Sequence, residues 1–212
     1  MSAGELPSDV REALCEARQE VAARADGHLP MATRRALRRT LAQEPPSATE
    51  AAGPAAVLTR LDELCVLRAL PAWIAERPGD ERPQRALAIA RELFERQTEF
   101  ATVKLELDRF DVELDDLGLA RTAERAWAVG QAAVDTAFTA QFGDYYGSDM
   151  PPGTNDEGLD PYGWAVDFLT CLAEAPSFPR DGILEHVEPR RAFWRWYLDE
   201  AVPEAWRATG GP

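Results

Sequence analysis

The chain has 212 residues, of which 45% are hydrophobic, and its formal net charge is −14. This length is enough to bury a sizeable core, so we expect one domain over residues 1–212. No run approaches the roughly eighteen apolar residues that span a bilayer, and residues 1–10 lack a signal-peptide pattern, so a cytoplasmic protein is expected. Lys104 is the only lysine, and the acidic balance opposes sequence-independent binding to nucleic acid.

Apolar residues recur at helical spacing through the first hundred residues. The pattern predicts helices over residues 8–25 and 31–42, then a loop over residues 43–54 and a long helix that ends at Pro78-Gly79. Pro71 is expected to kink this long helix because it lacks a backbone donor. Asp80 is expected to cap the next helix, with Pro83 in its first turn.

Residues 103–117 fit two patterns. Their apolar residues make one helical stripe, but residues 103–107 and 110–114 also alternate like two strands joined at Asp108-Arg109. We favour the helix, because Asp108-Arg109 is a weak hairpin turn and an isolated hairpin is marginally stable. The expected fold class is therefore all-α, a multi-helix bundle or short helical stack, with a small β-hairpin near 103–114 as the alternative.

The second half alternates helices with proline-marked boundaries. Residues 119–141 are expected to form a helix, and residues 143–160, rich in Gly, Pro, Asp and Asn, a long exposed acidic loop. Asp160-Pro161 and Glu188-Pro189 each read as a helix start, with a capping acid and a first-turn proline. Pro203 is expected to end the last helix.

Sequence signatures of catalysis and metal binding are missing. The chain has no glycine-rich phosphate loop, no G-x-S-x-G and no H-E-x-x-H, and neither His28 nor His186 follows an acid by three residues. We expect no enzyme, no metal and no cofactor. The three cysteines, Cys15, Cys65 and Cys171, are expected to be buried free thiols.

The negative charge is concentrated in one stretch that also carries aromatic residues. Between Asp135 and Glu188 there are eleven acids and one arginine, Arg180. Acids interleaved with tyrosines suggest a surface for a basic protein partner, although an acidic face that only maintains solubility is the plain alternative. The candidate binding residues are Asp144, Tyr145, Tyr146, Asp149, Asp156, Glu157, Asp160 and Tyr162. The arginines at 34, 35, 38 and 39 are expected to be solvated or paired with this acidic part.

Several short motifs resemble a known family. They are Ala69-Leu70-Pro71-Ala72-Trp73 with Pro78-Gly79-Asp80 and Pro83, Asp160-Pro161-Tyr162-Gly163-Trp164, and the aromatic run at 193–197 followed by Ala201-Val202-Pro203. Together they resemble the immunity proteins of bacterial polymorphic-toxin systems, in particular the mostly helical fifth class, over nearly the whole chain. Within these motifs, Pro71, Trp73, Asp80, Pro83, Trp164 and Trp194 are expected to be architectural.

The resemblance implies a helical protein that binds and neutralises a cognate toxin without catalysis. Toxins with a basic phosphate-binding site, such as nucleases, would suit an acidic inhibitor. The chain departs from the family pattern at residues 143–159 and 175–182, where partner specificity is expected to diverge. Two other functions remain open: a small-molecule site enclosed by Trp73, Trp127, Trp164 and the C-terminal aromatics, and a helical adaptor for a host protein.

Overall fold

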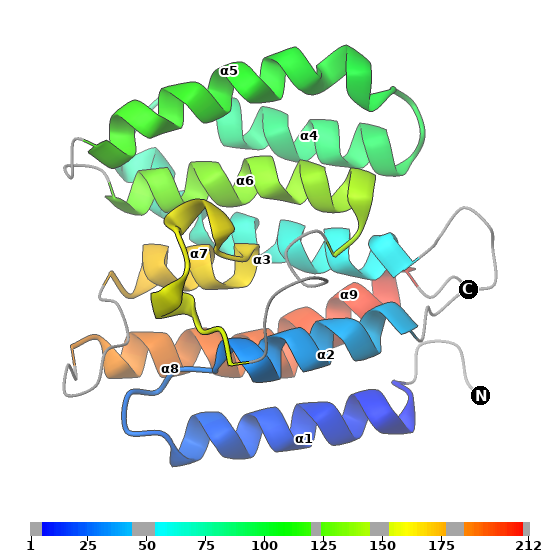
Figure 1. The fold of residues 1–212 in the computed structure, drawn as a ribbon, viewed down its shortest axis with the longest axis vertical. Helices are drawn as coiled ribbons and strands as arrows, with labels where there is room; N and C mark the ends of the chain where they lie inside the picture. The colour runs from blue at the N-terminus through cyan, green and yellow to red at the C-terminus, as the bar shows by residue number, and fades with distance from the viewer. Residues whose placement is uncertain (1–5, 44–53, 120–123, 145–152, 177–184, 210–212) are drawn as a thin grey trace.

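The computed structural model describes residues 6–43, 54–119, 124–144, 153–176 and 185–209. Regular structure in these ranges is helical throughout, which confirms the all-α prediction. The helices lie across the long axis of the molecule, one above another (Figure 1). The α-helices are α1 Ser8–Ala23, α2 Met31–Gln43, α3 Pro54–Glu76, α4 Arg82–Phe94, α5 Phe100–Leu119, α6 Glu124–Phe142, α7 Val166–Glu174, α8 Val187–Trp196 and α9 Val202–Thr209.

Helix α6 lies at the centre of the upper part of the stack. It contacts α3, α4, α5 and α7, and most of its residues are buried around the whole circumference. A helix that is surrounded in this way needs small residues where neighbours come close. At Gly130 an added Cβ would lie 3.1 Å from the Trp73 ring and 2.4 Å from a methyl group of Leu114.

Residues 103–117 are helical, so the alternative hairpin is wrong. They lie within α5, and Val103, Leu107, Phe110 and Leu114 form its buried stripe. Helix α5 extends to Leu119, whereas the sequence had placed the start of the next helix there; α6 begins at Glu124.

Proline placement at α3 and α4 agrees with the sequence in part. Helix α3 continues through Pro71 to Glu76, and the proline itself is exposed. Pro83 lies in the first turn of α4, as predicted. Asp80 accepts a hydrogen bond from the backbone N–H of Arg82 at 3.2 Å, although Glu81 is the N-cap residue.

Pro203 does not end the last helix. A π-helical turn, η3 Tyr197–Ala201, joins α8 directly to α9, and the backbone N–H of Val202 donates to the carbonyl of Tyr197. Pro203 is the second residue of α9, directly behind the π turn, where the regular i to i−4 hydrogen bonding is already interrupted.

The structure corrects two other expectations from the sequence, one for a cysteine and one for a helix start. Cys65 and Cys171 are buried free thiols, but Cys15 is exposed on α1. Asp160-Pro161 opens only a three-residue 3-10 turn, η2 Pro161–Gly163, and α7 begins later, at Val166. Among the residues described, no helix is both long and apolar enough to cross a membrane.

Candidate partner-binding surface

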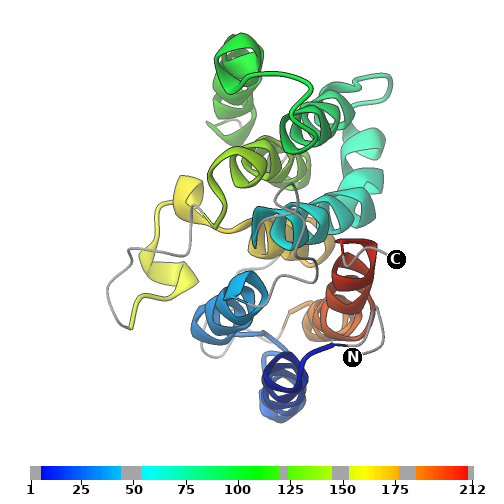
Figure 2. The same ribbon diagram turned by 90° about the vertical axis from the view of Figure 1, so that its right-hand side faces the viewer.

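Residues 153–165, here called the η1–η2 segment, lie along one side of the helical stack (Figure 2). The segment contains two 3-10 turns, η1 Asp156–Gly158 and η2 Pro161–Gly163. Side chains cap both turns: Asn155 accepts from the backbone N–H of Gly158 at 3.0 Å, and Asp160 from that of Tyr162 at 3.1 Å. The sequence therefore folds this segment locally through Asx-type caps.

A buried ion-pair network fastens the segment to α2 and α7. Asp156 is 5% exposed and pairs with Arg34, whose guanidinium also donates to Asp167 at 2.5 Å. His28 Nε2 lies 3.2 Å from Asp156 Oδ2. Because a buried charge that loses its partner is strongly destabilising, this network holds Asp156 in one position.

The network sets the ionisation of its members. Burial alone would raise the pKa of Asp156, but the charge of Arg34 and hydrogen bonds from His28 and Arg34 outweigh burial and lower this pKa to about 2. Burial lowers the pKa of His28 more than Asp156 raises it, so His28 is neutral at pH 7. Asp156 is therefore ionised in the folded protein, and its charge is used in a buried ion pair.

Trp164 is a second fastening point. Its indole N–H donates to the backbone carbonyl of Asp156 at 2.8 Å. Its ring meets Trp127 and Phe168 edge to face, with centroids 6.3 and 5.3 Å apart. Such contacts add to the apolar area that the ring buries, so Trp164 supports the segment from beneath.

Arg38 forms a neighbouring buried pair. Its guanidinium donates to both oxygens of Asp62, at 2.6 and 3.2 Å, and its Nε donates to Asp144 at 3.2 Å. Thr139 also donates to Asp62, at 2.8 Å. Two arginines of the 34–39 cluster thus pair with acids, including Asp144 and Asp156 of the acidic stretch, which was one of the two expectations.

Tyr162 is the exposed aromatic residue of the segment, with 46% of its surface accessible. Its hydroxyl donates to Asp115 on α5, and its ring meets Trp127 edge to face at 6.2 Å. The hydrogen bond to Asp115, together with burial and the charges of Asp111 and Asp160, raises the pKa of Tyr162 to about 12.

Asp115, the partner of Tyr162, is one of three acids on one flank of α5. Asp108, Asp111 and Asp115 follow one another at helical spacing, and Asp108 accepts from Lys104 at 2.5 Å. Burial and the charges of Asp115 and Asp108 raise the pKa of Asp111. The acidic patch is defined here as Asp108, Asp111, Asp115, Glu157, Asp160 and Tyr162.

The predicted binding residues separate into three groups. Glu157, Asp160 and Tyr162 are exposed. Asp144 and Asp156 pair with Arg38 and Arg34 of α2. These two positions of the expected exposed loop are therefore held against the helical stack. Tyr145, Tyr146 and Asp149 lie outside the described residues. The acids of α5 were not among the predicted binding residues, although their spacing of three and four residues is visible in the sequence.

The residues expected to be architectural have structural contacts. Trp73 is fully buried, and its indole N–H donates to the carbonyl of Asp80 at 2.7 Å. Trp194 is fully buried against His28 and Tyr197. Pro71 lies within α3 and is exposed.

The large aromatics considered above for a ligand site are packed against other side chains of the described residues. Trp73 and Trp194 are buried at 0% exposure, Trp127 is 8% exposed, and their rings pack against other side chains. A groove of about 440 Å³ lies elsewhere, between α4 and α5. Within the described ranges, no group of histidine, cysteine, aspartate and glutamate residues is arranged to hold a metal ion.

Comparison with known proteins identifies the family. Residues 14–204 match the family model described as immunity protein Imm5. None of the curated proteins compared with the sequence matches it significantly. Because the family model covers most of the chain, the protein belongs to the Imm5 family of immunity proteins.

Proposed function

We propose that this Imm5 immunity protein neutralises a cognate toxin by presenting the acidic patch to a basic site on it. Membership in an immunity family implies binding to a toxin without catalysis. The basic character of the toxin and the location of the contact are inferences from this chain. A phosphate-binding site, as in a nuclease, would be a fitting target, because carboxylates can occupy the place of phosphates.

One observation carries the proposal: an exposed tyrosine surrounded by carboxylates on a segment that is fastened from below. Tyr162 offers a ring edge and a hydroxyl, and tyrosine is frequent at the energetic centres of interfaces. Asp111, Asp115 and Asp160 make its surroundings negative. Complementary charge accelerates encounter and disfavours wrong partners.

The buried network beneath the patch supports the same function. Arg34, Asp156 and Trp164 hold the η1–η2 segment before any partner arrives. A segment that is already ordered loses less conformational entropy on binding, which favours affinity. Several acids of the acidic stretch pair internally with arginines, among them Asp144, Asp156 and Asp167.

The first experiment is capture of the toxin. The tagged protein is incubated with lysate of its own bacterium at low and high salt, and retained proteins are identified by mass spectrometry. We expect a basic toxin domain whose retention falls with salt, because screening weakens exposed charge pairs. Retention of no toxin domain, with toxin genes expressed, would contradict the proposal.

The second experiment locates the contact. The variant Asp115→Asn, Glu157→Gln, Asp160→Asn removes three patch charges, and its association rate with the captured toxin is measured at several salt concentrations. We expect a rate about tenfold lower, with weaker salt dependence.

The matched control removes three charges from the opposite end of the stack. Glu12→Gln, Glu16→Gln and Glu200→Gln alter exposed acids on α1 and η3 and change the net charge equally. We expect less than a twofold change in rate. Equal effects of the two variants would show that only net charge matters, and the proposed location would be wrong.

A further inference from the structure

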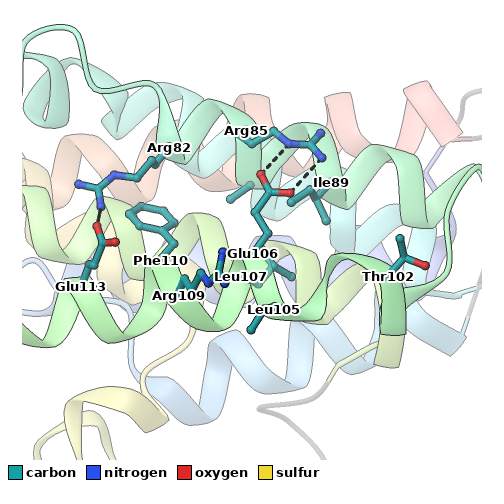
Figure 3. A pocket seen from close by; sticks show the side chains of 11 residues that line it. Arg82, Arg85, Ile89, Thr102, Leu105, Glu106, Leu107, Arg109, Phe110 and Glu113 are labelled. Atoms are coloured by element: carbon teal, nitrogen blue, oxygen red, sulfur yellow. Dashed lines mark hydrogen bonds and ion pairs between the residues drawn. The ribbon is translucent and has the colours of Figure 1, made fainter.

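Helix α5 separates the acidic patch from a groove of different chemistry. The groove has a volume of about 440 Å³ and is lined by α4 and α5 (Figure 3). Three arginines and two glutamates line it, so its lining carries a formal charge of +1 on a chain of −14. These charged residues are Arg82, Arg85, Arg109, Glu106 and Glu113.

The floor of the groove is apolar and its walls are bridged by charge pairs. Ile89, Leu107 and Phe110 are buried there. Arg85 reaches across from α4 and donates to Glu106 at 2.9 and 3.2 Å, and Arg82 pairs with Glu113. Figure 3 shows Phe110 between these two bridges, and the Arg82 guanidinium lies 5.0 Å from the Phe110 ring centroid.

Arg109 differs from the other two arginines. It is exposed on α5, and no acid of the described residues forms an ion pair with it. Arg82 and Arg85, in contrast, each have two acidic partners. A carboxylate entering the groove would therefore find one guanidinium without a competing internal partner, in a forked geometry suited to carboxylate.

The crest of α5 between patch and groove is apolar and exposed. Leu105 is 59% exposed and Val112 64% exposed, and their spacing of seven residues places them on the same face of the helix. Asp108, Asp111 and Asp115 lie on one flank of this crest, and Glu106, Arg109 and Glu113 lie on the groove flank. The groove flank carries a positive side chain, Arg109, and an exposed apolar crest beside such a charge is a surface typical of protein interfaces.

We propose that the α4–α5 groove binds an acidic, apolar-containing segment of the same toxin whose basic site meets the acidic patch. This inference rests on the proposed function for the identity of the partner. The carboxylate of that segment pairs with Arg109, and its apolar side chains cover Leu105 and the groove floor. The toxin surface then carries basic groups on one side of α5 and acidic groups on the other.

Two synthetic hexapeptides test the groove without any toxin. One alternates glutamate and leucine, the other alternates lysine and leucine, and each is titrated into the ¹⁵N-labelled full chain while amide NMR signals are recorded. We expect the glutamate peptide to shift the signals of residues 82–89 and 102–113, and the lysine peptide those of the acidic patch. Absence of groove shifts with the glutamate peptide at millimolar concentration would overturn the proposal.

Arg109→Glu and Lys104→Glu form a matched pair of variants. Both reverse one exposed positive charge on α5, but Lys104 lies outside the groove lining and pairs with Asp108. Arg109→Glu should weaken binding of the glutamate peptide about fivefold or more. Lys104→Glu should weaken it less than twofold, and equal weakening would also overturn the proposal.

The same pair, measured against the captured toxin, keeps the two proposals apart. We expect Arg109→Glu to raise the dissociation constant and Lys104→Glu to leave it nearly unchanged. If the patch variant weakens toxin binding and Arg109→Glu does not, the groove proposal is wrong and the proposed function stands. If no toxin is captured, the proposed function fails, and the peptide titration still decides whether the groove takes acidic segments.

Discussion

Replacing Asp156 by asparagine tests the claim that this carboxylate belongs to the architecture and not to the binding surface. Asparagine keeps the shape of the protonated acid but cannot carry the charge that faces Arg34. The expected loss of stability follows from the pKa of Asp156, which is about 2 in the folded protein against an ordinary value of 3.8. One unit of pKa corresponds to about 1.4 kcal/mol, so the charge contributes about 2–3 kcal/mol at neutral pH.

The lowered pKa of Asp156 also predicts how the effect of the substitution on stability changes with pH. The folded pKa of Asp156 is lower than the unfolded one, so the contribution is complete above about pH 5 and is lost as the pH falls through 3.8 toward 2. The difference in unfolding free energy between the wild type and Asp156→Asn should therefore decrease from about 2–3 kcal/mol at pH 7 to about 1 kcal/mol at pH 2.5.

Urea unfolding followed by tryptophan fluorescence measures this difference, and an unchanged slope would show that both proteins expose similar surface. Asp160→Asn is the control, because Asp160 is exposed and asparagine also caps turns; we expect it to change stability by less than about 0.5 kcal/mol. A gap for Asp156→Asn that stays constant with pH, or that is no larger than that of Asp160→Asn, would refute the reasoning.

Three further predictions concern packing and the patch. Trp73→Ala should lower the unfolding free energy by about 3–5 kcal/mol, because it opens a cavity beneath α4; urea midpoints measure it, and a loss below about 1 kcal/mol would contradict the core position. Gly130→Ala should cost about 1–3 kcal/mol in the same assay, since its Cβ meets a Leu114 methyl group at 2.4 Å. In an ultraviolet titration Tyr162 should ionise near pH 12, and Asp115→Asn should move its pKa toward 10; a tyrosine titration unaffected by Asp115→Asn would show that the two groups do not interact.

Local periodicity was sufficient to predict most helices. In residues 103–117 the apolar spacing favoured a helix over a hairpin, and the turn chemistry at Asp108-Arg109 decided between them correctly. Proline rules were less reliable. They mark where a backbone donor is missing, but Pro203 lies within a continuing helical segment because a π turn precedes it.

The candidate site was predictable only where one stretch of chain supplies it. Asp160 and Tyr162 stand together in the sequence, and composition alone drew attention to them. The internal role of Asp156 depends on Arg34, 122 positions earlier, and the link from Tyr162 to Asp115 spans 47 positions. Such pairings follow from tertiary packing, so the sequence could suggest an acidic surface without saying which acids remain on it.

Pro71 shows the same limit for a motif. Its place in a family-like motif suggested an architectural role, and its ring is exposed on a helix that continues past it. Proline inside a helix lowers stability relative to alanine. The residue therefore adds no buried contact, and its neighbour Trp73 carries the packing.

The π turn at Tyr197–Ala201 accounts for the spacing of the C-terminal aromatics. Buried residues there come in adjacent pairs that repeat every four positions, at 193–194, 197–198, 201–202 and 205–206. On a regular α-helix, residues four positions apart differ in direction by about 40°. Over three such repeats the difference reaches about 120°, and the last pair would point away from the core. The wider turn takes in one additional residue and removes about 100° of that rotation, which returns Trp206 to the face that Trp194 occupies. Insertion of one further residue within 197–201 would therefore rotate the end of the chain away from the core by about 100°, whereas deletion of one residue there would leave a regular α-helix with Trp206 on the same face.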